Sequence, residues 1–333
     1  MNIDRLFERL LAERVLFIDP SPELMAASAA LEQSPMGAAP RFDQLRTPEA
    51  WAEFRGAVMP FSPYIQEWNA RGAALAREVE IDGPGGKLVV RIVAPQDGRV
   101  RGGLFHTLGG GWIANTPASF DYKHAQAAEL CGLVVACVDW RKAPEHPYPA
   151  QLDDMEAACL WFIDFMREEY AQDRMFLRGE SSGGNTGAAT MLRMKRKHGF
   201  VFDGAVLDIG CFDLSGSLPS HRENDHRNQG MDSVSVDQLA DLYLQGGEDR
   251  RDPDVSPMYG DLAGLCPALF TCGDLDVLRD GAFLMHMRWL AAGNESWLVD
   301  FRGIGHVMAL MDCPEVEMEA LFATRFLDRL IAG

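Results

Sequence analysis

The sequence predicts an α/β protein with a mostly parallel sheet covered by helices on both faces. Short apolar runs alternate with stretches of helical length, which is typical of parallel strands joined by crossover helices. The first two runs are joined by a Gly-Pro-Gly-Gly sequence at residues 83–86, which indicates a turn. The runs lie at 78–82, 88–93, 103–105, 133–138, 175–177, 205–209, 268–271 and 297–301.

Two segments interrupt this pattern. Residues 1–75 contain no strand-like run, and apolar residues near the N-terminus recur at helical spacing, which predicts helices. These residues are Leu6, Phe7, Leu10, Leu11, Val15 and Leu16. Between about residues 213 and 251, a polar stretch at 215–232 precedes an amphipathic stretch at 234–244. We expect this second segment to be an insertion that folds over the carboxyl edge of the sheet.

The composition limits the classes of partner. The chain has 333 residues, 47% of them hydrophobic, which is enough for one large core with a smaller appendage. Its 31 basic and 49 acidic residues give a formal charge of -18, so the surface repels phosphates and anionic lipid headgroups. We therefore expect neither nucleic acid nor a membrane as a partner.

The sequence also predicts a cytoplasmic protein. Charged residues are spread through positions 1–20, so no apolar signal-peptide core is present there. No run approaches the ~18 consecutive apolar residues of a membrane span. The seven cysteines lack a C-x-x-C pair and lie mostly in apolar runs, which predicts buried thiols rather than disulfides or a metal site.

The strongest local motif lies at residues 177–185, which read L-R-G-E-S-S-G-G-N. A G-x-S-x-G pattern follows a strand-like run and precedes a helix of small residues at 186–194. In such a strand-to-helix turn the glycines avoid collisions with neighbouring backbone, and Ser181 is presented at the top of the sheet. The helix that begins at Ser182 adds N–H groups and a positive dipole end. These features favour Ser181 as a nucleophile over an incidental serine in a glycine-rich turn.

A second glycine-rich segment follows the run at 103–105 and reads H-T-L-G-G-G-W at residues 106–112. Three consecutive glycines let backbone N–H groups approach a ligand oxygen closely, whereas in a merely flexible loop they would only cost conformational entropy. We therefore expect this segment to supply hydrogen-bond donors to an oxyanion beside Ser181.

A serine nucleophile needs a base, and the base needs an acid that orients it. With this motif the chain order is serine, acid, histidine. His286 lies in a predicted helix, whereas His306 lies in a loop after the run at 297–301, so His306 is the better base. Three candidate acids follow the run at 268–271, namely Asp274, Asp276 and Asp280. Their spacing alone does not choose among them.

Several segments resemble the hormone-sensitive-lipase-like esterases, also called bacterial family IV carboxylesterases. Residues 139–150 (D-W-R-K-A-P-E-H-P-Y-P-A) are similar to that family's D-Y-R-L-A-P-E-x-P-F-P-A segment. Residues 256–258 and 264–268 are similar to its S-P-L and G-L-P-P-A segments, and residues 276–280 (D-V-L-R-D) to its D-P-L-R-D segment. The matches cover about residues 75–310 in the family's order.

The resemblance implies a fold and a set of domains. The fold is the α/β-hydrolase fold, with a mostly parallel eight-stranded sheet and a helical cap. Residues 1–75 would form N-terminal cap helices, with the first of them part of a mobile cap. Residues 76–333 would form the catalytic domain, with a second cap segment inserted at about 213–251.

The resemblance also assigns roles to individual residues. It nominates Asp276 as the acid that orients His306 in a triad with Ser181. The family's H-G-G-G pattern aligns with residues 108–111. This alignment implies an oxyanion hole made by the amides of Gly110, Gly111 and Ser182.

The chain departs from the family pattern at a few positions. Glu180 and Ser182 replace the usual Asp and Ala beside the nucleophile, Val277 replaces a proline, and Leu108 replaces a histidine. Leucine can only pack, so another residue has to hold the glycine segment in its donor geometry. Alternate residues of a strand face opposite sides, so His106 shares the side of Leu108 and is the residue we expect to do this.

The activity implied by the resemblance is that of a serine carboxylesterase, which hydrolyses short- to medium-chain acyl esters through an acyl-enzyme on Ser181. The partner would be a small-molecule ester, no cofactor or metal would be needed, and a homodimer is expected. One alternative is an amide, lactone or thioester hydrolase on the same triad, because leaving-group preference depends on pocket shape. Another is a non-catalytic ligand receptor of this fold, as in the plant gibberellin receptors.

Overall fold

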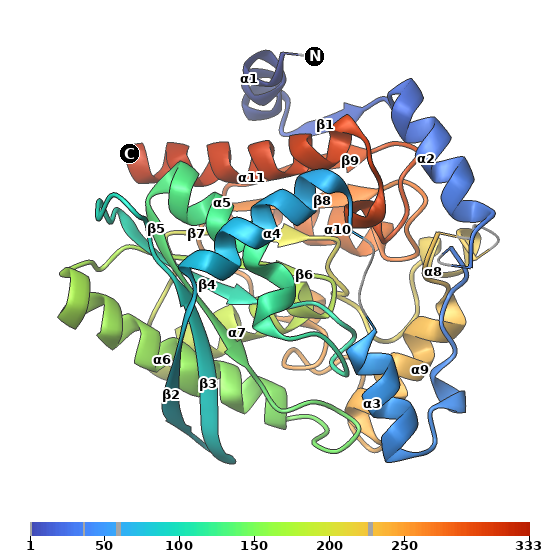
Figure 1. The fold of residues 1–333 in the computed structure, drawn as a ribbon, viewed down its shortest axis with the longest axis horizontal. Coiled ribbons are helices and arrows are strands. Elements are labelled where there is room, and N and C mark those ends of the chain that lie inside the picture. The colour runs from blue at the N-terminus through green and yellow to red at the C-terminus, as the bar shows by residue number, and fades with distance from the viewer. Residues whose placement is uncertain (1, 36, 58–60, 226–228) are drawn as a thin grey trace.

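The computed structural model describes the chain except for residues 1, 36, 58–60 and 226–228 (Figure 1). The excluded positions 58–60 and 226–228 belong to the two predicted cap segments, so that part of the prediction lies outside the described residues. Within the described residues no helix combines the length and the apolar character needed to cross a membrane.

A nine-stranded sheet runs through the described chain in the order β1-β9-β8-β7-β6-β4-β5-β3-β2. Neighbouring strands from β1 to β5 are all parallel, whereas β3 is antiparallel to both β5 and β2. The strands are β1 (Val15–Ile18), β2 (Arg77–Gly83), β3 (Gly86–Val93), β4 (Gly102–Thr107), β5 (Leu133–Asp139), β6 (Met175–Glu180), β7 (Gly204–Asp208), β8 (Ala268–Gly273) and β9 (Ser296–Phe301).

Helices cover both faces of this sheet. α5 and α11 pack together on one face, with α1 beside α11, and α6, α7 and α10 pack on the strands from the other. The helices are α1 (Ile3–Glu13), α2 (Pro22–Glu32), α3 (Pro48–Gly56), α4 (Pro63–Leu75), α5 (Asp121–Cys131), α6 (Ala150–Tyr170), α7 (Ser182–His198), α8 (Ser220–Glu223), α9 (Ser233–Leu244), α10 (Arg279–Ala291) and α11 (Pro314–Ala332). The central strands are therefore buried on both faces, which explains why they read as nearly continuous apolar runs.

The predicted fold class is confirmed, and every predicted apolar run overlaps a strand, with ends that differ by at most three residues. The number of strands is nine rather than eight, because residues 15–18 form a strand where only helix was expected. Arg14 ends α1 in the left-handed conformation, with φ 66°, and its carbonyl accepts a hydrogen bond from Leu298 N–H of β9. Val15 and Leu16 continue the apolar spacing of α1, so the spacing of apolar residues gave no sign of the change from helix to strand.

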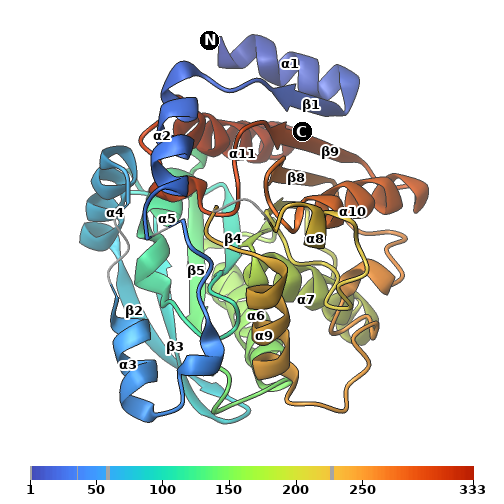
Figure 2. The same ribbon diagram turned by 90° about the vertical axis from the view of Figure 1, so that its right-hand side faces the viewer.

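The N-terminal segment divides into parts with different surroundings. α1 packs on α11 and β1 at one edge of the sheet, as Figure 2 shows, and buries Leu6, Phe7 and Leu10 there. None of its residues lines the cavity described below. Packing at the sheet edge thus accounts for the apolar stripe of α1, contrary to the expectation that this helix covers the pocket. The cap role of residues 1–75 as a whole stays a prediction.

The buried face of β1 gives a test of this arrangement. Leu16 has no exposed surface, so Leu16→Ala should lower the free energy of unfolding by about 2–5 kcal/mol through lost burial and a residual cavity. Urea denaturation followed by circular dichroism measures this. Leu130→Ala in α5 is the matched control, because Leu130 is 46% exposed and should change stability by less than about 0.5 kcal/mol. Equal, small effects of both substitutions would contradict the packing of β1.

Candidate active site

Ser181 lies in the turn between β6 and α7 in a conformation that side chains rarely adopt, with φ 55° and ψ −121°. The Ser181 N–H donates to the Asp208 carbonyl at 3.0 Å, and the Cys211 N–H donates to the Ser181 carbonyl at 3.1 Å. A Cβ on Gly183 would overlap the carbonyl oxygen of Thr107. The end of β7 and the tight approach of α7 to β4 therefore hold the serine at the carboxyl edge of the sheet.

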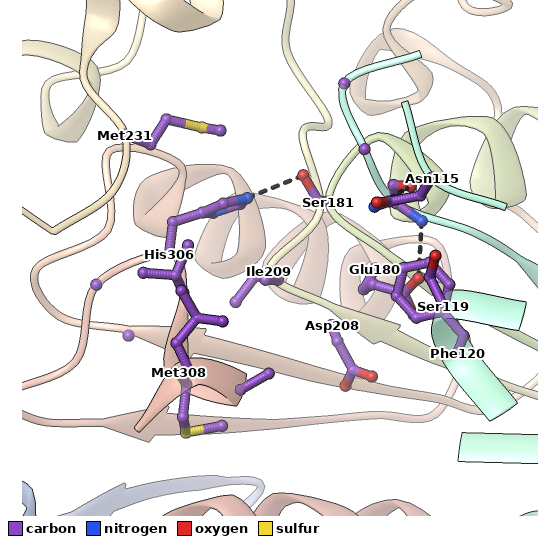
Figure 3. Close-up of a pocket in the computed structure, with 18 of the residues that line it drawn as sticks. Asn115, Ser119, Phe120, Glu180, Ser181, Asp208, Ile209, Met231, His306 and Met308 are labelled. Carbon is purple, nitrogen blue, oxygen red and sulfur yellow. Dashed lines mark hydrogen bonds between the residues drawn. The ribbon is translucent and has the colours of Figure 1, made fainter. Parts of the chain in front are cut away.

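The structure brings Ser181, His306 and Asp276 together, although they come from three separate loops. His306 Nε2 lies 2.9 Å from Ser181 Oγ, as Figure 3 shows. His306 Nδ1 lies 2.8 Å from Asp276 Oδ2. Both the histidine and the aspartate are shielded from water, since His306 is 8% and Asp276 only 1% exposed. A proton can thus pass from Ser181 to an imidazole that already faces a carboxylate on its other nitrogen.

The other candidate acids have different partners. Asp274 Oδ1 accepts from Gly303 N–H at 2.7 Å, and Asp280 Oδ2 accepts from Ser220 N–H at 2.9 Å. Asp276 also accepts from Leu278 N–H at 3.0 Å through its second oxygen, which fixes the carboxylate toward the histidine. Of the three candidate acids, Asp276 is therefore the one whose carboxylate contacts His306 in the described chain.

His286, the rejected base, lies elsewhere. It is buried in α10, where its Nδ1 is 2.8 Å from Ser296 Oγ. Burial lowers the pKa of this imidazole to about 4. It is therefore a neutral histidine of the core without contact to Ser181.

The three predicted oxyanion donors lie at the same edge of the sheet. Gly110 and Gly111 adopt positive φ angles of 126° and 62°, and both line the cavity together with Ser181. In the described part of the chain, the N–H groups of these two glycines have no hydrogen-bond acceptor. Ser182 is the first residue of α7, where N–H groups lack intrahelical partners. Gly110 and Gly111 thus bring N–H groups without an acceptor to the cavity that Ser181 lines, and Ser182 directly follows the serine.

A cavity of about 310 Å³ opens in front of Ser181. Its walls combine side chains from the N-terminal segment, the insertion, the segment after the glycine loop and the loop of His306. Most of them are apolar, and they include Phe42, Phe54, Phe61, Ile65, Ile113, Phe120, Met231, Leu239, Val307 and Met308. Figure 3 shows Met231 and Met308 on the side of His306, with Asn115 and Phe120 on the other side of Ser181. The cavity suits a short apolar group attached to the atom that Ser181 attacks.

One end of the cavity is charged. Lys123 Nζ lies 3.1 Å from Asp208 Oδ2 and 3.5 Å from Glu319 Oε1, and Arg178 contacts the same two carboxylates at 2.9 and 2.6 Å. Burial raises the pKa of Asp208, but Lys123 and Arg178 outweigh it and hold that pKa below its ordinary value. Burial, opposed by Lys123 and assisted by Asp208, raises the pKa of Glu319. The two cations, Lys123 and Arg178, are thus paired with the two carboxylates, Asp208 and Glu319.

One group in the described chain has ligand atoms spaced closely enough for a metal ion, namely His106, His124 and Cys137, with ligand atoms within 4.8 Å of one another. His106 Nδ1 and His124 Nε2 lie 3.0 Å apart and satisfy each other as a hydrogen bond. Burial raises the pKa of the Cys137 thiol well above its ordinary value. We therefore assign this group to hydrogen bonding.

Two residues of the site were missed by sequence reasoning. Glu180 Oε1 accepts from Gly109 N–H at 2.7 Å, and Asn115 Nδ2 donates to the Gly109 carbonyl at 3.1 Å. In the sequence Glu180 was noted only as a replacement for the family's aspartate. The available signal was its place one residue before Ser181, because the Glu180 side chain contacts His106 of β4 and the Gly109 N–H.

Comparison with known proteins finds a family model of the α/β-hydrolase fold, and the relatives described here are an acetyl-hydrolase and esterases. The family model described as alpha/beta hydrolase fold matches residues 104–310. An acetyl-hydrolase of Streptomyces hygroscopicus is 30% identical over 215 residues, which span 64% of this chain and 69% of the relative. The solved structure of a hyperthermophilic esterase from the archaeon Pyrobaculum calidifontis is similar with a TM-score of 0.79 at 23% identity, over 95% of this chain and 100% of that one. An esterase from the bacterial hormone-sensitive lipase family gives 0.74 at 22% identity, over 94% and 100%.

The contacts of the aspartates lead to a prediction. Asp276→Asn should slow phosphonylation of Ser181 by a p-nitrophenyl phosphonate by about 10⁴-fold. The substitution removes the anion that stabilises the imidazolium and that holds the His306 ring in the tautomer able to accept the serine proton. Asp274→Asn should cost about 10-fold or less, since it only loosens Gly303 in the loop before His306. Release of nitrophenol under single-turnover conditions measures both rates. A larger loss in Asp274→Asn would show that the wrong carboxylate was assigned.

Proposed function

The chain belongs to the α/β-hydrolase family, and from this premise we propose that it is a serine carboxylesterase acting on short- to medium-chain acyl esters through an acyl-enzyme on Ser181. The family resemblance predicted from the motifs is confirmed by the relatives described above. The observation that carries the proposal is the line of hydrogen bonds from Ser181 through His306 to Asp276, next to unpaired amides in an apolar cavity.

The proposed reaction has two halves. His306 Nε2 takes the proton of Ser181 as Oγ attacks the ester carbonyl, and Asp276 stabilises the imidazolium that forms. The amides of Gly110, Gly111 and Ser182 hold the oxyanion. His306 then gives its proton to the departing alcohol, leaving an acyl-enzyme. Water, deprotonated by His306, attacks this ester, and collapse of the second oxyanion releases the carboxylic acid and returns the proton to Ser181.

The cavity supports the proposed chain length. Its volume of about 310 Å³ and its aromatic and methionine walls fit an acyl group of a few carbons. The paired charges of Lys123, Asp208 and Glu319 lie at one end, where a long alkyl chain would have to pack against them. We therefore propose that activity falls for long acyl chains.

The alternatives differ in what supports them. A receptor without catalysis is disfavoured because His306, itself in contact with Asp276, lies 2.9 Å from the hydroxyl of Ser181 and can act as its base. Amide, lactone or thioester hydrolysis would use the same residues and remains the second candidate. A homodimer, a cytoplasmic location and a cap formed by residues 1–75 and 213–251 stay predictions of the sequence.

The nucleophile can be tested directly. Ser181→Ala should lower kcat on p-nitrophenyl butyrate by at least about 10³-fold with an unchanged melting temperature, as in removals of a triad residue elsewhere. Mass spectrometry after treatment with an organophosphate should locate the adduct on Ser181. Ser217→Ala is the matched control, because Ser217 bonds only Asp213 in the described chain and should leave turnover unchanged. An adduct on another serine would overturn the assignment.

The substrate class can be tested with a matched panel. p-Nitrophenyl esters from acetate to palmitate should give the highest kcat/KM between about two and eight carbons, and the corresponding p-nitroanilides should react more slowly by several orders of magnitude. Anilides that react as fast as esters would favour the amide hydrolase. A rising kcat/KM toward palmitate would contradict the limit that we assign to the charged end of the cavity.

A further inference from the structure

Gly109, the first residue of the glycine loop (Gly109–Gly111), is clamped from both sides of its backbone. Its N–H donates to Glu180 Oε1 at 2.7 Å, and its carbonyl accepts from Asn115 Nδ2 at 3.1 Å. Glu180 is 6% exposed, so this amide-to-carboxylate bond is shielded from water. Charge-assisted bonds of this kind are short and strong. The position of Gly109 is therefore set by the residue that directly precedes Ser181.

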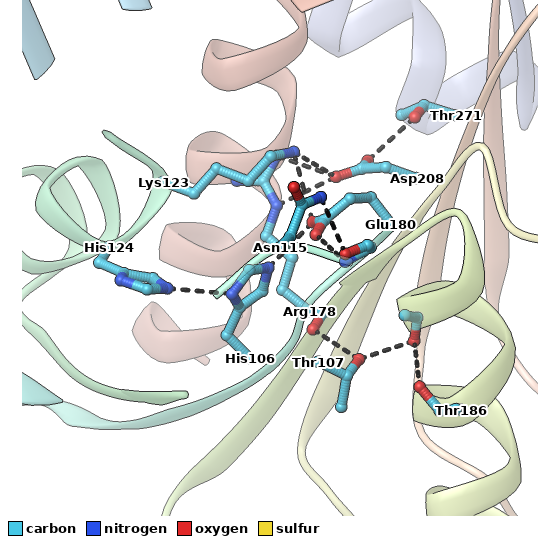
Figure 4. Close-up of polar contacts among 12 residues, drawn as sticks. His106, Thr107, Asn115, Lys123, His124, Arg178, Glu180, Thr186, Asp208 and Thr271 are labelled. Carbon is cyan, nitrogen blue, oxygen red and sulfur yellow. Dashed lines mark hydrogen bonds and ion pairs between the residues drawn. The ribbon is translucent and has the colours of Figure 1, made fainter. Parts of the chain in front are cut away.

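The second oxygen of Glu180 is held in turn by histidine. His106 Nε2 lies 2.9 Å from Glu180 Oε2, as Figure 4 shows, and Lys123 Nζ is 3.8 Å from the same oxygen. Burial raises the pKa of Glu180, but His106, Lys123 and the Gly109 amide together bring it below its ordinary value. The carboxylate is thus charged at neutral pH and has a fixed orientation.

A further histidine fixes His106. His124 Nε2 lies 3.0 Å from His106 Nδ1, and His124 Nδ1 lies 3.4 Å from Asp121 Oδ1. Burial lowers the pKa of His124 to about 4, so at neutral pH this ring carries one proton. His124 Nε2 and Glu180 Oε2 thus contact the two opposite nitrogens of the His106 ring. Arg91 closes the chain of contacts with two bonds to Asp121, at 2.8 and 2.6 Å.

This chain of contacts takes the place of a missing polar side chain in the loop itself. Leu108 is fully buried in the apolar core and offers no hydrogen bond. His106 was expected to hold the loop directly, but the structure gives it no contact with Gly109, Gly110 or Gly111 in the described chain. It acts on the loop through Glu180.

We propose that Glu180 is the positioning residue of the oxyanion hole, which fixes the glycine loop through Gly109, and that His106 and His124 hold Glu180 in place. This inference rests on the proposed function. A shift of Gly109 would move the N–H groups of Gly110 and Gly111 away from the developing oxyanion. A displacement of about 1 Å in such a site lowers the rate by up to about 100-fold.

The experiment compares Glu180→Ala with Glu180→Gln on p-nitrophenyl butyrate. Glu180→Ala should lower kcat by about 10- to 100-fold and change KM by less than about 3-fold, because the lost interaction acts on the transition state. Glu180→Gln keeps an oxygen for the Gly109 N–H and should retain kcat within about 10-fold. Glu315→Ala is the matched control: Glu315 is a fully buried carboxylate that accepts from a backbone amide, Ser21 N–H at 2.8 Å, and does not line the cavity.

An inhibitor pair separates positioning from general damage. A trifluoromethyl ketone adds to Ser181 and places an oxyanion in the hole, whereas the corresponding secondary alcohol fills the same cavity without one. In Glu180→Ala the inhibition constant of the ketone should rise by the same factor as kcat/KM falls, and that of the alcohol should stay within about 2-fold. Equal weakening of both inhibitors would overturn the proposal, as would an unchanged kcat.

A second variant covers a failure of Glu180→Ala to fold, which circular dichroism would reveal. His106→Ala leaves Glu180 in the chain but removes its orienting partner, so it should lower kcat by about 10-fold with the same contrast between ketone and alcohol. An unchanged kcat in a folded His106→Ala would overturn the role of the histidines. A wild-type protein that cleaves no ester would instead refute the proposed function, which keeps the two failures distinct.

Discussion

The structure depends on one strained backbone position, Ser181, whose φ of 55° holds the side chain above the sheet. Such conformations cost on the order of 1–3 kcal/mol and persist only where the surroundings fix them. Here the last residue of β7 bonds the N–H of Ser181, Cys211 in the loop after β7 bonds its carbonyl, and α7 approaches β4 so closely that Gly183 cannot carry a side chain. The same close approach brings β4, and with it the glycine loop, next to the nucleophile. Strain at one residue therefore sets the geometry of the whole site.

Beneath this turn, charges rather than apolar groups fill part of the interior. Arg178 of β6 is 1% exposed and faces Asp208 of β7 and Glu319 of α11, while Lys123 of α5 reaches the same carboxylates. Buried charges are tolerable only when each has a close partner, and removal of one leaves another uncompensated. The strand that carries the nucleophile is thus tied to helices of one face by ion pairs whose failure would be costly. Glu180 joins this cluster through Lys123.

Sequence reasoning succeeded where the signal was local. Apolar runs located the eight strands after residue 75, and the motif around Ser181 located the turn that the structure shows. It failed where the deciding contact spans many residues. The strand at 15–18 forms because β9, nearly 300 residues later, offers it an edge, and Glu180 meets His106 only after β4 and β6 have paired. The choice of Asp276 required the family's D-P-L-R-D pattern, since three aspartates follow the same strand.

The two ends of the sheet have a consequence for self-association. Sheets can grow between molecules when an exposed edge strand offers unpaired backbone groups. On one side β1 occupies the edge of β9 with only four residues, and on the other β2 exposes Glu78, Glu80 and Asp82. Two copies of β2 laid side by side would bring these acidic side chains together in a protein that already carries a net charge of -18. Lys87 and Arg91 of β3 pair with these acidic residues within one molecule, so the β2 edge is lined by charged side chains. A charged edge strand on one side and a very short one on the other disfavour continuous sheets across two molecules and the fibrous aggregates that grow in the same way.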